Sequence, residues 1–244
     1  MKKFLRKKIL KSSCIEIDGV VFNLLQKRIK NLHLRIYPPH GEVRISAPLR
    51  LDLVAIKKFI STKISWIKTQ QIKIKNRKRA EPLKFISGES HYFFGKKYVL
   101  QIFENSKKNI VIINGDEIEI HGKKNLDFKK RQKLLDEFYR NELKKLVPQL
   151  IFQYEKIMQV KVSHFGIKKM TTRWGTCNIK AKRIWINLEL AKKRVECLEF
   201  IVVHEMTHLL ERKHSKKFFA FMDKFMPNWQ VWKGELKTSS TFLA

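Results

Sequence analysis

The chain has 244 residues, of which 43% are hydrophobic and 11% aromatic, a composition that excludes an intrinsically disordered protein. Its length allows one large domain or two small ones, each with a buried core. Lys and Arg outnumber Asp and Glu by 53 to 22, giving a formal net charge of +31. Such a charge attracts nucleic acid, free nucleotides or acidic protein surfaces, although lysine-rich faces that only maintain solubility are an equal alternative.

The cysteines and the N-terminal segment indicate the cellular compartment of the protein. Cys14, Cys177 and Cys197 lie far apart, which predicts a reducing compartment without a disulfide framework. Residues 1–11 are basic but lack the continuous apolar run of a secretory signal, and no stretch reaches the roughly 20 apolar residues of a membrane span. We expect a cytoplasmic protein, with the alternative that this tail rests on an anionic membrane surface.

The first half of the chain predicts strands and one helix. Alternating apolar residues on both sides of a Pro-Pro-His-Gly turn predict a hairpin over residues 32–46. Apolar residues at steps of three and four then predict an amphipathic helix from Asp52 to Lys73. The basic run 73–79 favours a linker over a nucleic-acid patch. Further strands are expected at 91–94, 98–102, 110–113 and 117–120, giving a small, mostly antiparallel sheet.

The second half is mainly helical. A stripe of apolar residues predicts a helix from about Leu126 onward that Pro148 should kink or divide. Short strands and loops cover 160–187, a helix follows at about 195–210, and a last one runs from Ser215 to Met226. We therefore predict an α+β protein with a β-rich domain over 1–125 and a compact helical domain with short strands over 126–244.

The chemistry concentrates in His204-Glu205-Met206-Thr207-His208, an HExxH motif followed by His214. On a helix the outer histidines stand one turn apart on one face, so both imidazoles can reach one metal ion. The neighbouring helix positions are apolar almost all the way round, which predicts a buried helix. Burying these polar groups is costly unless a divalent cation satisfies them. The alternative is a chance match or a hydrogen-bonded core cluster.

Three histidine ligands indicate a catalytic zinc site, because they leave one tetrahedral position open. Glu205, beside that position, could take a proton from water and pass it to a leaving group, so metal-assisted hydrolysis is predicted. Substrate-binding candidates are Arg173, a fixed cation able to stabilise an oxyanion or hold a phosphate, Trp174 and Asn187. An arginine that only stacks on Trp174 is the alternative, and Asn187 is a candidate for orienting backbone near the metal.

Several motifs together resemble the YgjP-like metallopeptidase family, which is related to the SprT-like zinc proteases of the zincin group. They are Thr172-Arg173-Trp174-Gly175-Thr176-Cys177-Asn178, Ile184-Trp185-Ile186-Asn187-Leu188, Val202-Val203-His204-Glu205-Met206-Thr207-His208 and His214-Ser215-Lys216-Lys217-Phe218. The resemblance implies Zn²⁺ held by His204, His208 and His214, Glu205 as general base, and a zincin-like C-terminal domain. Thr172, Thr176 and Asn178 replace the family's usual serines, which leaves the metal site intact and the loop's role in substrate contact open.

Three functions follow from these observations. A zinc-dependent peptidase is the leading hypothesis. A zinc-dependent nucleotide pyrophosphatase is the second, because members of the resembled family are sometimes described as UTP pyrophosphatases, but the sequence has no Gly-rich phosphate loop or acidic magnesium-binding cluster. A nucleic-acid-associated zinc protease is the third, by analogy with the SprT-like relatives and from the positive charge.

Overall fold

A computed structural model describes residues 9–37, 40–76, 83–104 and 106–238, and the chain folds into two compact units. Unit 1 comprises residues 1–81 with 243–244, and unit 2 comprises residues 82–242. This boundary differs from the expected one at 125/126. The reason is packing: Leu100, Ile118 and Ile120 from the second group of strands are buried in one core with Leu135 and Tyr139 of the following helix.

Unit 1 contains a four-stranded sheet in the order β1-β2-β4-β3, formed by β1 (Ile9–Ile17), β2 (Val20–Lys27), β3 (His33–Tyr37) and β4 (Glu42–Pro48). The predicted hairpin is confirmed as the antiparallel pair of β3 and β4. β1 and β2 lie outside the predicted elements, and β2 pairs with β4 in parallel. The unit's core gathers side chains of these strands and of two helices, including Phe22, Ile45, Ile56, Ile60 and Ile67.

The single helix expected from Asp52 to Lys73 is two helices, α1 (Leu53–Ser61) and α2 (Ile64–Lys75). Asp52 is the N-cap, as predicted, and accepts a hydrogen bond from the Ala55 backbone N–H at 2.7 Å. The helix breaks because the Lys63 N–H turns back to the Ile60 carbonyl at 2.8 Å, a tighter turn than an α-helix makes. The basic run continues past α2 into residues 77–79, which lie outside the described residues, as do residues 1–8 of the basic tail.

Unit 2 begins with a second four-stranded sheet, β5 (Ser90–Phe93), β6 (Lys96–Glu104), β7 (Ile110–Asn114) and β8 (Glu117–Gly122), in the order β5-β6-β8-β7. All four strands were expected from the sequence. The outer pairs are antiparallel and the central pair, β6 with β8, is parallel. The β-structure of the first 125 residues is therefore two sheets in two units instead of one.

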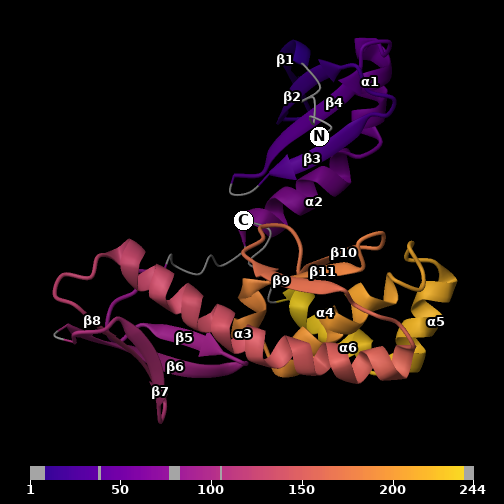
Figure 1. Ribbon diagram of the computed structural model, residues 1–244. Helices are drawn as coiled ribbons and strands as arrows, with labels where there is room; N and C mark the ends of the chain where they lie inside the picture. Colours follow the sequence, from indigo (N-terminus) through magenta and orange to yellow (C-terminus); the bar gives the residue numbers. More distant parts are fainter. Residues whose placement is uncertain (1–8, 38–39, 77–82, 105, 239–244) are drawn as a thin grey trace. The chain divides into compact units, whose positions relative to one another are not determined.

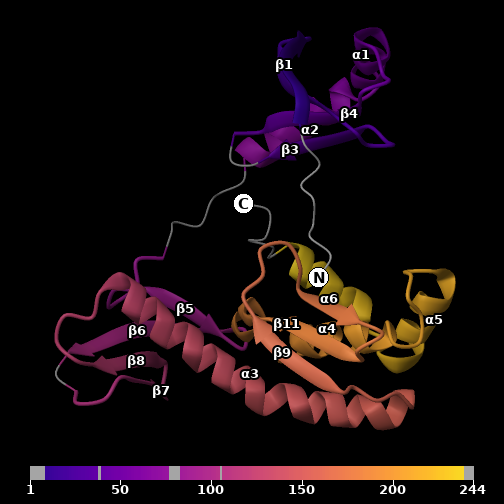
Figure 2. The same cartoon turned by 45° about the horizontal axis from the view of Figure 1, so that its top comes forward.

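A 31-residue helix, α3 (Phe128–Met158), runs from the second sheet to the C-terminal helices (Figures 1 and 2). Pro148 does not divide it, contrary to one expectation. The proline is exposed, whereas Val147, Leu150 and Ile151 on either side of it are buried. The missing backbone N–H therefore lies on the solvent side, and core packing on the opposite face keeps the helix continuous.

The C-terminal half of unit 2 contains a three-stranded sheet and a central helix. The sheet order is β10-β11-β9, from β9 (His164–Lys168), β10 (Gly175–Asn178) and β11 (Arg183–Asn187), followed by the 3-10 helix η1 (Leu188–Lys192). The helices are α4 (Val195–Thr207), α5 (Lys216–Phe225) and α6 (Trp229–Thr238), the last of which was not predicted. Because α4 packs against α3, α5, α6, β10 and β11, it is the buried helix that the sequence predicted. The α+β class is confirmed.

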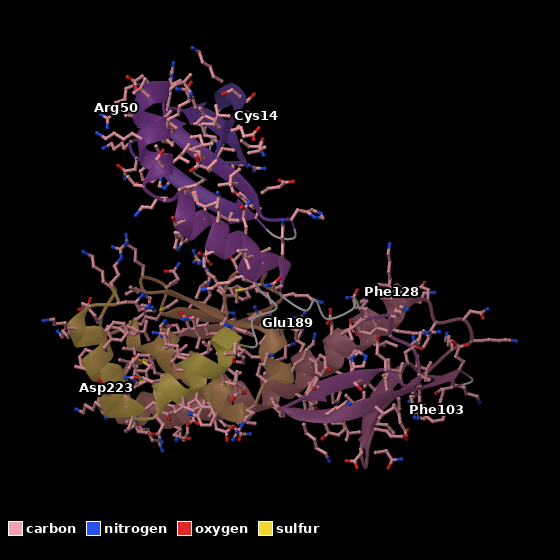
Figure 3. The ribbon with its side chains drawn as sticks, turned by 180° about the vertical axis from the view of Figure 1, so that it is seen from behind. Cys14, Arg50, Phe103, Phe128, Glu189 and Asp223 are labelled. Carbon is pink, nitrogen blue, oxygen red and sulfur yellow. The ribbon has the colours of Figure 1, made fainter. Side chains whose placement is uncertain are left out.

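The three cysteines are free thiols. Cys14 is exposed on unit 1 (Figure 3), Cys177 is half-buried on β10 and Cys197 is buried in α4. Burial raises the pKa of the Cys197 thiol to about 12, which keeps it protonated. Among the described residues, no helix has the length and apolar character needed to cross a bilayer.

Candidate metal centre

Helix α4 carries His204 and Glu205 in its last turn, and His208 caps its C-terminus. The imidazole rings of His204 and His208 lie 5.1 Å apart between centroids and nearly perpendicular. The rest of the helix is anchored in the core by Cys197, Leu198, Phe200, Ile201, Val202, Val203, Met206 and Thr207. An immobile helix therefore presents both imidazoles from the same side.

His214 joins the pair because the chain turns sharply after α4. The backbone N–H groups of Leu210 and Glu211 both donate to the Thr207 carbonyl at 3.0 Å, which ends the helix. Ser215 then caps α5 by accepting a hydrogen bond from the Phe218 N–H at 3.4 Å. The turn brings His214 Nε2 to 3.1 Å from His204 Nε2, and one ring nitrogen from each of the three histidines lies within 4.8 Å of the others.

The donor set fits a zinc ion. Zn–N bonds of about 2.0–2.1 Å in tetrahedral geometry separate two ligand nitrogens by roughly 3.3 Å, close to the separation of the His204 and His214 nitrogens. Metal ligation also requires neutral imidazoles. Burial, with the charges of His208 and His214 as smaller causes, lowers the pKa of His204 to about 3. Burial likewise lowers the pKa of His208, so these rings are neutral at pH 7.

Two neighbours fix the rings. The Nδ1–H of His208 donates to the Glu211 carbonyl at 3.2 Å, which leaves Nε2 as the nitrogen available to a metal. The fully buried ring of Phe218 lies 5.0 Å from His204, 4.8 Å from His208 and 4.7 Å from His214 between centroids. Sequence reasoning missed this support, since an apolar residue on the first turn of α5 is an ordinary core position.

Glu205 lies beside the histidines, only 5% exposed, and burial raises the pKa of its carboxyl to about 8, although the positive charge of Arg173 opposes the rise. The carboxylate rests against the backbone of β10 at Gly175. A Cβ at that position would lie 2.6 Å from Glu205 Oε1 and 2.9 Å from Ile201 Cγ2. Only glycine allows this approach.

Gly175→Ala is therefore expected to displace the Glu205 carboxylate while leaving the histidines in place. We expect metal content to be unchanged and any hydrolytic activity of the site to fall at least about tenfold, because a shift of about 1 Å in a reacting group can cost up to 100-fold. Gly234→Ala on α6, where a Cβ meets nothing within 4 Å, is the matched control. Equal kcat/KM for Gly175→Ala and wild type would show that the carboxylate's position is unimportant.

A hollow of about 460 Å³ opens over this cluster. It is lined by Arg173, Gly175, Thr176, Cys177, Ile179, His204, Glu205, His208, Arg212 and His214. The predicted Arg173 is thus at the site, and Arg212 is an additional cation that sequence reasoning missed. Burial raises the pKa of the Cys177 thiol to about 11, so this residue is present as a thiol. Trp174 does not line this hollow, and its half-buried ring packs against the core of unit 2.

Asn187 is fully buried and binds backbone groups of the loop that precedes β10. Its Nδ2 donates to the carbonyls of Met170 at 3.0 Å and Arg173 at 2.7 Å, while Oδ1 accepts from the N–H groups of Met170 and Glu189, both at 3.2 Å. The side chain does not line the hollow. Asn187 therefore lies where it can orient the loop that carries Arg173. The sequence suggested this role for Asn187 in addition to substrate binding.

Asn187→Ala removes four part-buried hydrogen bonds and leaves their backbone groups without these partners. We expect the free energy of unfolding to fall by about 2–4 kcal/mol, because each unsatisfied buried group costs about 1–3 kcal/mol and the loop can partly relax. Urea denaturation measures this loss. Asn178→Ala, at the exposed end of β10, should cost less than about 1 kcal/mol. A similar cost for both variants would contradict the assigned role.

A protein-family model described as "YgjP-like, metallopeptidase domain" matches residues 30–239. The chain belongs to the YgjP-like family. This YgjP-like chain is accordingly a metallopeptidase, a hydrolase whose family acts on peptide or protein substrates. No curated protein matches its sequence. Among solved structures, the zymogen of the metallopeptidase abylysin from Pyrococcus abyssi is similar over 39% of this chain and 95% of that chain, with a TM-score of 0.37 and 18% identity. That likeness is too slight to support an inference.

Proposed function

We propose that the chain is a zinc-dependent peptidase in which His204, His208 and His214 hold the metal and Glu205 is the general base. One observation carries the proposal: three imidazole nitrogens converge within 4.8 Å beside a buried carboxyl group. Two of the imidazoles are held neutral by burial, as ligands must be. Three protein ligands leave a position for water or substrate, which is typical of catalytic zinc.

Zinc bound there would supply Lewis acidity, lowering the pKa of water toward about 7 and polarising a carbonyl group. Glu205 would accept a proton from the attacking water and deliver it to the leaving amine. Burial raises the pKa of Glu205 to about 8, and a nearby divalent cation favours its charged form. Together these influences leave a base that works near neutral pH. Arg173, on the rim, is placed to stabilise negative charge on the substrate oxygen.

Strand β10 supports a peptide as the substrate. It is an edge of the three-stranded sheet, and three of its residues, Gly175, Thr176 and Cys177, line the hollow. An extended peptide can pair with an exposed strand edge through its main chain, which would draw a scissile bond past Glu205. A nucleotide has no such backbone. The residues lining this hollow also include one carboxylate only, fewer than a magnesium-dependent nucleotide hydrolase needs.

The test compares casein, a mixed library of quenched fluorescent peptides and UTP as substrates of one preparation. We expect hydrolysis of peptides that stops on chelation and returns with added zinc. Turnover of UTP alone would favour a pyrophosphatase and overturn the proposal. Peptide hydrolysis that survives complete removal of metal would also contradict it.

A further inference from the structure

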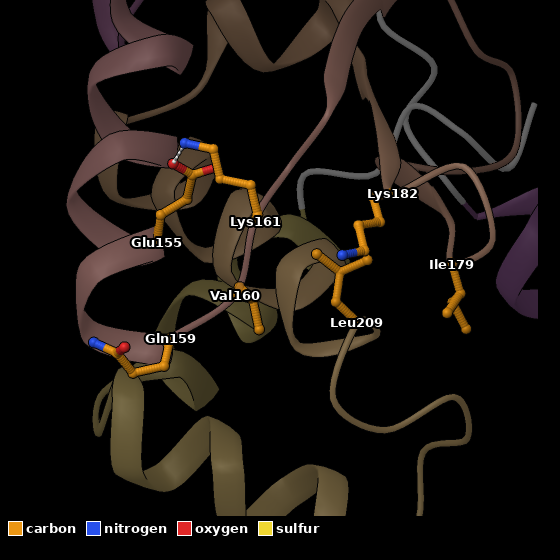
Figure 4. A pocket seen from close by; sticks show the side chains of 7 residues that line it. All are labelled: Glu155, Gln159, Val160, Lys161, Ile179, Lys182 and Leu209. Carbon is orange, nitrogen blue, oxygen red and sulfur yellow. Dashed lines mark hydrogen bonds and ion pairs between the residues drawn. The ribbon is translucent and has the colours of Figure 1, made fainter.

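Two further hollows at the β10–β11 hairpin share lining residues with the hollow over the histidines. The second, of about 520 Å³, is lined by Cys177, Asn178, Ile179, Lys180 and Arg212. The third, also about 520 Å³, is lined by Glu155, Gln159, Val160, Lys161, Ile179, Lys182 and Leu209 (Figure 4). Ile179 borders all three, and we call the three hollows together the hairpin cleft.

Besides Lys161, which pairs with Glu155, four Lys and Arg side chains line the hairpin cleft: Arg173, Lys180, Lys182 and Arg212. All four are exposed, and none makes an ion pair with a carboxylate of the described residues within 4.0 Å. Nine other Lys and Arg side chains of the described residues, among them Lys96 and Arg131, do pair with a carboxylate. Within the described part of the chain, no direct ion pair therefore offsets the charges of these four side chains, although the charge of Arg173 acts on the nearby Glu205.

The two carboxylates of the cleft cannot offset this charge. Glu155 already binds Lys161 at 2.9 Å, the pair drawn with a dashed line in Figure 4, and accepts from the Val162 N–H at 2.7 Å. Glu205 is buried beside the histidines. A positive field inside a concave surface is stronger than on a flat one, because the low-dielectric walls focus it.

Lys180 and Lys182 lie on a hydrogen-bonded turn at the tip of the β10–β11 hairpin. At the hairpin tip the Lys182 N–H donates to the Ile179 carbonyl at 3.2 Å, and the Ala181 N–H donates to Asn178 Oδ1 at 3.1 Å. The Lys182 carbonyl accepts from the Ser163 N–H at 2.8 Å. These bonds hold the backbone at the hairpin tip, from which the exposed side chains of Lys180 and Lys182 extend.

We propose that the hairpin cleft selects acidic peptide segments, with Asp or Glu residues flanking the bond that is cut. The proposal rests on the proposed peptidase function and adds its substrate class. Charge complementarity also fits a single-stranded nucleic acid, but such ligands stack their bases on aromatic rings. None of the described residues that line the three hollows is Phe, Tyr or Trp. The edge strand β10, in contrast, suits a peptide backbone.

Binding and hydrolysis of three peptides test the proposal. The peptides share length and sequence except that the residues flanking the central bond are all Glu, all Gln or all Lys. Binding is measured by fluorescence anisotropy with zinc-loaded Glu205→Gln protein, and hydrolysis with wild type. We expect the Glu peptide to bind and react about tenfold better than the Gln peptide, since several exposed charge contacts each contribute a small factor. The preference should shrink as salt rises from 50 to about 500 mM.

The double variant Lys180→Glu, Lys182→Glu tests whether these two lysines cause the preference for the Glu peptide. We expect it to lose the preference for the Glu peptide over the Gln peptide. The double variant Lys107→Glu, Lys108→Glu is the matched control, because it makes the same change in net charge on the exposed segment between β6 and β7, away from the residues of the cleft. It should keep the full preference.

The outcomes separate this inference from the proposed function. Equal binding of the three peptides would overturn the inference, even if all three are hydrolysed. Tight, lysine-dependent binding of the Glu peptide without any hydrolysis by wild type would support the cleft's selectivity and refute the peptidase. A single-stranded oligonucleotide that requires Lys180 and Lys182 and displaces all three peptides equally would assign the cleft to nucleic acid and overturn the inference.

Discussion

His208→Ala should purify without zinc and without peptidase activity. Removing one of three imidazoles leaves two ligands, which cannot hold zinc in a tetrahedral site. Replacing groups that only support a ligand already weakens metal binding by about 10–100-fold, so the loss of a ligand itself should exceed about 100-fold. Zinc content by atomic emission and affinity by chelator competition measure the loss, and hydrolysis is followed in the same samples.

The matched control is His164→Ala, an exposed histidine on β9 that is outside the metal-binding trio. It should keep full zinc content and full activity. His208 is also the C-cap of α4, so circular dichroism must show that the variant folds. A folded His208→Ala protein that retains one tightly bound zinc per chain would show that the metal lies elsewhere.

Glu205→Gln is expected to keep zinc and lose hydrolysis by about 100- to 10,000-fold, the range that general acid–base catalysis contributes. Glutamine preserves the size of the side chain and fits beside Gly175, but it cannot accept a proton. Since Glu205 is buried, a neutral amide should not destabilise the fold. The measurement is kcat/KM for peptide hydrolysis together with zinc content in the same sample.

Glu196→Gln provides the control on the same helix, because Glu196 lies in the first turn of α4 and pairs with Arg194 at 3.0 Å. It should hydrolyse peptides at the wild-type rate. The assignment of the base would be wrong if Glu205→Gln matched Glu196→Gln in activity.

The core of the site could be predicted because it depends on local spacing. His204 and His208 share a face on any helix, and the apolar residues between and around them predict burial of that helix. The strands 90–122 and the caps Asp52 and Ser215 were predictable for the same reason, since each follows from a pattern of a few residues.

Contacts between distant segments could not be predicted. Gly175 is needed at the site because the carboxylate of Glu205, thirty positions later, lies against its backbone. No local sequence pattern predicts this contact. Arg212 is one of 53 Lys and Arg residues, so its place at the metal site had no distinguishing signal.

The boundary between the two units could not be predicted from the sequence either. Hairpin patterns indicate neighbouring antiparallel strands, but the parallel pairs β2 with β4 and β6 with β8 join strands that are not consecutive. These pairs create two separate sheets. The second sheet belongs with α3 because of side-chain packing in one core, which a change of composition along the chain does not reveal.

Anomalous diffraction from crystals of zinc-loaded protein, recorded at energies on both sides of the zinc absorption edge, would show where the zinc ion binds. We expect one strong peak per chain, about 2.0–2.1 Å from a ring nitrogen of each of His204, His208 and His214. A peak bound by other side chains, or no peak among these three rings at full zinc loading, would contradict the proposed metal site.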